Sequence, residues 1–306
     1  MNYKSILNLI GILLAIFSFA FIPPLIVTFI YEEPLSEIFL YSFLFLISLG
    51  GLMWFISRQK GLPLNISDGF IITTMFWVVL ACAGSIPFYF FGLSFNDAIF
   101  ESVSGITTTG ATLIVGLDDL PKSLLLYRQL LQWIGGMGLI ILAVAVMPAL
   151  GIGGSQLYKM ELPGSHGNQK LTPKITDSAK ALWKIYFGLT LACALLYILA
   201  GMDLFDAIAH SLSTVAGGGF STHDKSIGFF DSGLIEAVCI IFMLLSAASF
   251  AVHYAAIFGG KPLRYFYDSE FRFFLTVVMS IILITLIFHT ISNSYADVLL
   301  TLRASI

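Results

Sequence analysis

Residues 97–112 read DAIFESVSGITTTGAT, and residues 206–221 read DAIAHSLSTVAGGGFS. When Asp97 is aligned with Asp206, six of the 16 pairs in the two stretches are identical, including Gly110 with Gly219. Extending the same alignment in both directions also superposes the apolar runs on either side of each stretch. The chain therefore contains a repeated unit: an apolar run, a short segment, a Thr/Gly loop and a second apolar run.

The repeat lies in a chain that is apolar along most of its length. Of its 306 residues, 58% are hydrophobic and 11% are charged, whereas about 25% of the residues of an ordinary soluble domain are charged. A helix of about 20 residues crosses the ~30 Å hydrocarbon core of a bilayer. Runs of this length occur at residues 5–30, 36–57, 69–93, 124–150, 181–201, 234–258 and 273–292. The sequence predicts an all-α, polytopic membrane protein.

The distribution of charge predicts the orientation of the chain. With the amino terminus in the cytoplasm, most of the Lys and Arg residues fall on the cytoplasmic side, as they do in membrane proteins generally. The outer stretches are then acidic, which raises the local concentration of cations. Their carboxylates are Asp97, Glu101, Asp118, Asp119, Asp203, Asp206, Asp224 and Asp231. Any one of these is expected to be a solvated loop residue, so the evidence is the charge of the whole face.

The short segments of the repeat, residues 97–106 and 206–215, are too short to cross the membrane. About ten helical residues span ~15 Å, half of the hydrocarbon core. Asp97 and Asp206 are expected to cap their outward amino ends, so that the carbonyl ends point to membrane depth. Irregular backbone at that depth is tolerated only where protein buries it or where it lines a polar cavity. The repeat therefore predicts a lumen.

The Thr/Gly loops that follow are candidate cation filters. Rings of backbone carbonyls can replace the water around a cation, and turning successive carbonyls to one side requires positive φ, which Gly adopts easily. A lone Thr-Thr-Thr-Gly or Gly-Gly-Gly is more often a turn or a flexible link, but matched positions in a repeat favour a filter. The predicted filter residues are Thr108, Thr109, Gly110, Gly217, Gly218 and Gly219. The coordination of a cation is assigned to Thr108, Thr109, Gly217 and Gly218.

The run at residues 124–150 carries small and polar residues among its apolar ones. Its small residues, which are expected to let a neighbouring helix approach closely, are Gly135, Gly136 and Gly138. Arg128 lies near the outer end of this run. We expect it to reach the membrane interface or to pair with Asp118 or Asp119.

The sequence offers little to support catalysis. No Ser/His/Asp, Cys/His, metal-spaced or phosphate-loop motif occurs in the context that it requires. His223, in the polar segment that follows the second loop, is expected to be solvated. We therefore expect no enzymatic activity.

Three motifs resemble the Trk/Ktr/HKT superfamily of potassium transporters, and above all its bacterial TrkH branch. They are residues 101–112 (ESVSGITTTGAT), 127–138 (YRQLLQWIGGMG) and 218–224 (GGFSTHD). The resemblance covers nearly the whole chain. It implies helix, pore-helix, filter-loop, helix units like those of potassium channels, four around one pore, preceded by two accessory helices at residues 5–30 and 36–57.

The resemblance also implies a function, a location and partners. The protein would take up potassium across the bacterial inner membrane as a multi-pass protein, through a pore lined by the carbonyls of its filter loops. Potassium would be its bound ion, and it would form a homodimer that docks on a cytosolic, nucleotide-binding ring of TrkA-like subunits. No nucleic acid is expected. Channel-like flow and coupling to protons or sodium both stay open.

The predicted segments are an accessory pair of helices (1–65), a first pore unit (66–150), a cytoplasmic loop (151–176), a second pore unit (177–260) and the start of a third (261–306). With the third unit truncated and the fourth absent, we expect an incomplete form that is inactive alone, because two loops cannot close a ring of carbonyls. Two alternatives stay open. One is an ion-coupled solute carrier with broken helices, and the other is an assembly subunit that does not transport.

Overall fold

The computed structural model describes residues 3–58, 66–150, 175–260, 263–292 and 303, and all the regular elements among them are helices. The prediction of a helical membrane protein is confirmed. Five helical stretches are long and apolar enough to cross a bilayer: Tyr3–Ile30, Ser36–Ser57, Asp68–Phe91, Lys180–Leu199 and Ser269–Ile291. The chain forms two compact units, Met1–Ala247 and Ala248–Ile306. The predicted cytoplasmic loop lies almost wholly outside the described residues, and the five predicted segments stay a prediction.

The accessory part of the first compact unit is a pair of helical rods. Its elements are α1 (Tyr3–Ser18), the short 3-10 turn η1 (Phe19–Phe21), α2 (Ile22–Ile30) and α3 (Ser36–Ser57). The apolar run at residues 5–30 is therefore not one helix. It is interrupted just before Pro23 and Pro24, where proline removes hydrogen-bond donors and clashes with the preceding turn.

The first repeat unit follows these rods. Its elements are α4 (Ile66–Gly84), α5 (Ile86–Phe91), α6 (Phe95–Ile106), η2 (Leu117–Asp119) and α7 (Lys122–Leu150). Glu33, from the turn between α2 and α3, caps the amino end of α7, because its carboxylate oxygens accept from Lys122 N at 2.6 Å and Ser123 N at 3.0 Å. A carboxylate at this end of a helix is stabilised by the free N–H groups and by the helix dipole.

The second repeat unit has the same order of elements, except that one helix stands where the first unit has α4 and α5. They are α9 (Ile175–Leu199), α10 (Leu204–Ala216), η4 (Ser226–Phe230) and α11 (Gly233–Ser246). The expectation of one continuous helix over residues 234–258 is wrong, because α11 ends at Ser246 and α12 (Phe250–Ile257) begins only at Phe250. Ser246 and Ser249 flank this break, and serine side chains compete for backbone hydrogen bonds.

The second compact unit contains α12, α13 (Arg264–Tyr267) and α14 (Ser269–Ile291). His253 Nδ1 lies 2.7 Å from the Tyr265 hydroxyl and joins α12 to α13. Along α14 large apolar side chains are exposed, including Phe273 at 72%. Such a continuous apolar surface is suited to lipid.

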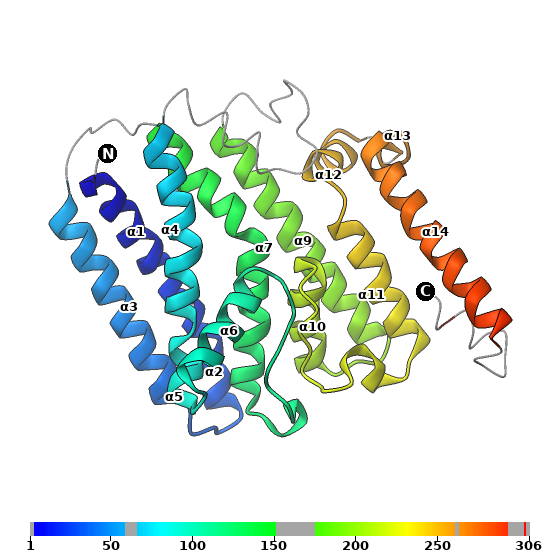
Figure 1. Cartoon of the computed structure of the whole chain (residues 1–306), viewed down its shortest axis with the longest axis horizontal. Helices are drawn as coiled ribbons and strands as arrows, with labels where there is room; N and C mark the ends of the chain where they lie inside the picture. Colours follow the sequence, from blue (N-terminus) through cyan, green and yellow to red (C-terminus); the bar gives the residue numbers. More distant parts are fainter. Residues whose placement is uncertain (1–2, 59–65, 151–174, 261–262, 293–302, 304–306) are drawn as a thin grey trace. The chain divides into compact units, whose positions relative to one another are not determined.

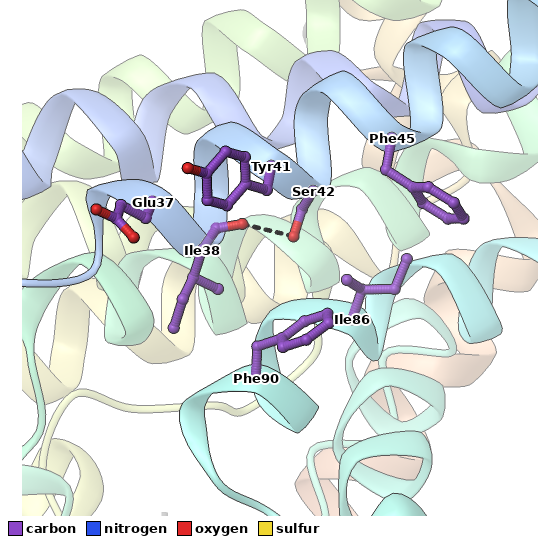
Figure 2. A pocket seen from close by; sticks show the side chains of 7 residues that line it. All are labelled: Glu37, Ile38, Tyr41, Ser42, Phe45, Ile86 and Phe90. Atoms are coloured by element: carbon purple, nitrogen blue, oxygen red, sulfur yellow. Dashed lines mark hydrogen bonds between the residues drawn. The ribbon is translucent and has the colours of Figure 1, made fainter.

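The outward surface of α3 is apolar as well. With α5 it borders a cavity of about 460 Å³ that is lined mainly by apolar side chains (Figure 2). Its lining residues are Glu37, Ile38, Tyr41, Ser42, Phe45, Ile86 and Phe90. The hydroxyl of Ser42 donates to the carbonyl of Ile38 at 2.7 Å.

Helix α7 packs against helices of both repeat units. It packs against α6 of its own unit and against α9 and α10 of the other (Figure 1). Both short helices therefore end against the same long helix, and this arrangement places the two Thr/Gly loops next to each other.

We predict that the contact between α1 and α3 depends on Gly50. A Cβ on Gly50 would lie 2.6 Å from Gly11 O and 2.7 Å from Ala15 N, whereas a Cβ on Gly51 would meet nothing within 4 Å. Gly50→Ala should lower the melting temperature of the purified protein, because overpacking costs about 1–3 kcal/mol. Gly51→Ala is the matched control and should have no effect or raise it, since Ala favours a helix. Equal melting temperatures for the two variants would contradict this packing.

Candidate cation-filter loops

The two short helices begin and end in equivalent ways. Ser94 caps α6 and accepts from Asp97 N at 3.2 Å, and Asp203, the equivalent residue of the second unit, caps α10 and accepts from Phe205 N at 3.1 Å. The prediction that Asp97 and Asp206 are the caps is wrong, since both lie inside the first turn. The helices start earlier than expected, and α6, with 12 residues, spans ~18 Å. They remain too short to cross the membrane.

The backbone of the two loops repeats bond for bond. Thr108 N and Thr109 N donate to the carbonyls of Gly105 and Ser104 at 3.0 and 2.9 Å. In the second loop, the equivalent residues make the equivalent bonds: Gly217 N to Thr214 O at 3.1 Å and Gly218 N to Ser213 O at 2.9 Å. This is a common way to close a helix, and here it sets the same exit direction for both loops.

The φ angles of the two loops also match. Thr108 and Gly217 have φ of 53° and 65°, Gly110 and Gly219 have φ of 75° and 82°, and the residue between each pair does not have positive φ. Positive φ is uncommon and strained in a non-glycine residue such as Thr108. The alternation expected at Gly110 and Gly219 is therefore present, and in each loop it begins before the glycine, at Thr108 and Gly217.

The two loops touch each other. A Cβ on Gly110 would lie 2.1 Å from the carbonyl oxygen of Gly218, so the loops approach at a distance that only glycine allows. Thr109 and Gly219 are exposed among the described residues, whereas Gly218 is buried. Each loop thus has one side against protein and one side open.

Small residues of α7 bring the helix close to both loops. A Cβ on Gly135 would lie 2.0 Å from Ile106 O at the end of α6, and one on Gly136 would lie 3.3 Å from Ala216 at the end of α10. A Cβ on Gly138 would lie 3.1 Å from the ring of Trp77. The expectation that these glycines are close-packing sites is confirmed.

A buried ion pair lies behind the loops. Glu101 and Arg128 have fully buried side chains, with Glu101 Oε2 and Arg128 Nε 3.5 Å apart. Glu101 Oε1 accepts from Thr112 Oγ1 at 2.5 Å and from Leu113 N at 2.7 Å. Arg128 donates to Thr112 Oγ1 at 2.9 Å and to Ser221 O at 3.2 Å. Arg128 therefore pairs with Glu101 and not, as expected, with Asp118 or Asp119, and it does not reach the membrane interface.

Gln132 supports the second loop from the same face of α7. Its Oε1 accepts from Phe220 N at 3.0 Å, and a Cβ on Gly218 would lie 2.3 Å from its amide carbon. A side chain at Gly218 would displace this amide. The glycine at this position is therefore favoured by a neighbouring side chain and not by its own φ.

His223 joins the outer parts of the loops. Its Nδ1 lies 2.5 Å from Asp118 Oδ1, its Nε2 lies 3.0 Å from Asp206 Oδ2, and its ring stacks on Phe229 with centroids 3.5 Å apart. Asp224 adds a second link by accepting from Gly116 N at 3.1 Å. The expectation of a solvated His223 is wrong. Among the described residues, no cluster of His, Cys, Asp and Glu side chains is suited to a metal ion.

The face that is predicted to be the outer one is less acidic than its composition suggests. Glu101 is 0% exposed and Asp206 is 9% exposed, so neither belongs to a solvated surface. Asp97 is half-buried, whereas Asp118, Asp119, Asp203, Asp224 and Asp231 are exposed. A hydrogen bond from His223 lowers the pKa of the Asp118 carboxyl below its ordinary value of 3.8, so this group stays charged near neutral pH.

One signal in the sequence could have revealed the buried pair. In the alignment of the two units, Arg128 and Gln132 of α7 fall on Ala237 and Ile241 of α11. Polar side chains in only one of two equivalent apolar helices indicate a role that the other helix lacks.

The chain is similar to known proteins over nearly its whole length. A model of the TrkH family, described as cation transport protein, matches residues 35–304. The Trk system potassium uptake protein TrkH of Vibrio parahaemolyticus is 48% identical over 302 residues, which are 97% of this chain and 62% of that protein. The protein of the same name in Escherichia coli K12 is 44% identical, over 99% of this chain and 63% of its own length.

A solved structure agrees with these sequence matches. The crystal structure of the potassium transporter TrkH from Vibrio parahaemolyticus superposes with a TM-score of 0.87 at 44% identity, covering 100% of this chain and 63% of that one. This chain thus spans a little under two thirds of the length of the relatives that it matches.

We predict that a side chain is tolerated less well at Gly110 than at Gly219. Both residues have positive φ, which costs a non-glycine residue about 1–2 kcal/mol. A Cβ on Gly110 would also strike Gly218 O, whereas one on Gly219 would meet nothing within 4 Å. Gly110→Ala should therefore lower the melting temperature more than Gly219→Ala. The reverse order would mean that the loops do not touch.

We also predict that Asp118 helps to hold the outer parts of the loops together. Asp118→Asn should speed amide hydrogen exchange in residues 112–121, while Asp119→Asn removes a charge from the same turn and should leave exchange unchanged. Because the pKa of Asp118 is lowered in the folded protein, its contribution is present above the ordinary value of 3.8 and is lost as pH falls through the lowered pKa. Equal exchange in the two variants would contradict the bridge through His223.

Proposed function

Because this chain belongs to the TrkH family of cation transport proteins, we propose that its two Thr/Gly loops form part of a filter for potassium uptake. The proposed ligands are the carbonyls of Thr108, Thr109, Gly217 and Gly218, with Gly110 and Gly219 shaping the backbone. The observation that supports this most directly is the matching alternation of φ in two touching loops.

The physical basis of the proposal is the exchange of water for fixed oxygen atoms. A dehydrated cation needs several ligands at once, and backbone carbonyls supply them without a buried counter-charge. Each loop has one open side among the described residues, and the two short helices lead into the loops with their carbonyl ends, where the helix dipole is negative. Exposed carboxylates at the outer face would raise the cation concentration nearby.

Two loops cannot surround an ion on all sides. We propose that the described loops act together with further filter segments, and that this chain by itself does not transport potassium. A complete ring also accounts for the open sides of the loops, since a surface that meets other filter segments does not need to be covered within these residues.

The location and partners that we propose follow from the same family. The relatives are named as proteins of a Trk potassium uptake system. We propose a multi-pass protein of the bacterial inner membrane with a cytoplasmic amino terminus, which forms a homodimer and docks on a nucleotide-binding, TrkA-like ring.

The test uses cells that lack other potassium importers and grow on limiting potassium. The chain alone should not restore growth. A chimera in which the chain replaces the matching residues of the Vibrio parahaemolyticus relative should restore it. In this chimera Gly110→Ser should lower the ratio of potassium to sodium uptake, because a Cβ intrudes where positive φ is needed. Growth with the chain alone, or an unchanged uptake ratio in the Gly110→Ser chimera, would contradict the proposal.

A further inference from the structure

The two short helices, α6 and α10, hold the loops that follow them through equivalent residues. Glu101 in α6 accepts from Thr112 Oγ1 at 2.5 Å, and His210, the equivalent residue in α10, lies with its Nε2 2.9 Å from Ser221 Oγ. Thr112 and Ser221 are themselves equivalent in the repeat. In each repeat unit, the residue two positions after the loop glycine therefore contacts the short helix of the same unit.

Arg128 connects these two attachment points. Its Nη2 donates to Thr112 Oγ1 at 2.9 Å and its Nη1 donates to Ser221 O at 3.2 Å, so one guanidinium bonds to equivalent positions of both loops. The guanidinium also lies over the ring of Phe220, 4.3 Å from the centroid. The planar fork of arginine suits such a double contact, whereas lysine offers a single compact charge.

The charge of Arg128 is balanced where it lies. Both Arg128 and Glu101 are fully buried, and a buried charge without a partner is strongly unfavourable. Replacing such a pair by apolar residues is often neutral or stabilising, so a buried pair is weak evidence for stability. At the equivalent position of the second unit, Ala237 in α11 carries no charge.

We infer that Arg128, held against Glu101, is a positioning residue that sets the spacing between the two filter loops and thereby the preference of the pathway for potassium. The contacts alone support the role of Arg128 in the spacing of the loops. Its role in ion preference rests on the proposed function. The distance between carbonyls decides how well an ion is held, and Arg128 joins the loops just beyond Gly110 and Gly219.

The first test measures loop mobility in the purified chain and needs no transport. Hydrogen exchange is followed in peptides covering residues 107–116 and 217–224. Arg128→Gln should speed exchange in both peptides by about tenfold or more, since hydrogen bonds to charged groups contribute more than neutral ones. Glu101→Gln should affect mainly the first peptide, because Glu101 accepts from Leu113 N and Ile114 N. Gln129→Leu is the matched control, a neighbour with a buried amide that makes no hydrogen bond within the described residues, and should change neither.

Arg128→Lys separates geometry from charge. It keeps the positive charge beside Glu101 but cannot bond Thr112 and Ser221 as the planar fork does. Faster exchange in both peptides for Arg128→Lys would support the inference. Exchange like that of the parent chain, or an equal change in peptides far from the loops, would overturn it.

The second test measures ion preference in the chimera with the Vibrio parahaemolyticus relative. Arg128→Lys and Arg128→Gln should lower the ratio of potassium to sodium uptake severalfold, while Gln129→Leu should leave it unchanged. A uniform loss of both fluxes with an unchanged ratio would overturn the role in ion preference. If the unsubstituted chimera moves no potassium, the proposed function fails, and the exchange measurement still decides whether Arg128 sets the loop spacing.

Discussion

Irregular backbone needs partners for its polar groups, and in this chain helix α7 supplies contacts to two loops at once. Gly135 and Gly136 let α7 approach the ends of both short helices, and Arg128 and Gln132 bond to the loops beyond them. Without these contacts, Phe220 N and Ser221 O would lose the partners that α7 provides. The position of the two loops therefore depends on one helix.

The role of α7 explains why the two units have matching loops but different residues in the helices that follow those loops. The loops share φ angles and hydrogen bonds because each must leave its short helix in the same direction. The supporting helices cannot be alike, because a single helix lies at the junction of the two units. Polar side chains are found in α7 and apolar ones at the equivalent positions of α11. The difference reflects the position of α7, which packs against helices of both units.

Much of this arrangement was predictable from sequence, because repetition and composition are local signals. The half-length helices, the register of the loops and the positive φ of Gly110 and Gly219 follow from the spacing of the repeat and from glycine itself. The positive φ of Thr108 did not follow, because threonine rarely adopts it. The ion pair of Glu101 with Arg128 and the bridge through His223 were not predicted. Both join residues of separate segments, and a local sequence pattern does not indicate which acidic residue pairs with which basic one. The interruptions before Pro23 and between α11 and α12 were not predicted either, because a continuous apolar run gives no sign of a short break in the helix.

We propose that the two loops line one path and bind a monovalent cation through backbone carbonyls. The most direct measurement is anomalous diffraction from crystals of the chimera grown with thallium or rubidium in place of potassium. The account predicts an anomalous peak within coordination distance of carbonyl oxygens from both loops, close to Gly110 and Gly218. Loops that stand apart, or a peak held only by side-chain carboxylates at the outer face, would contradict it.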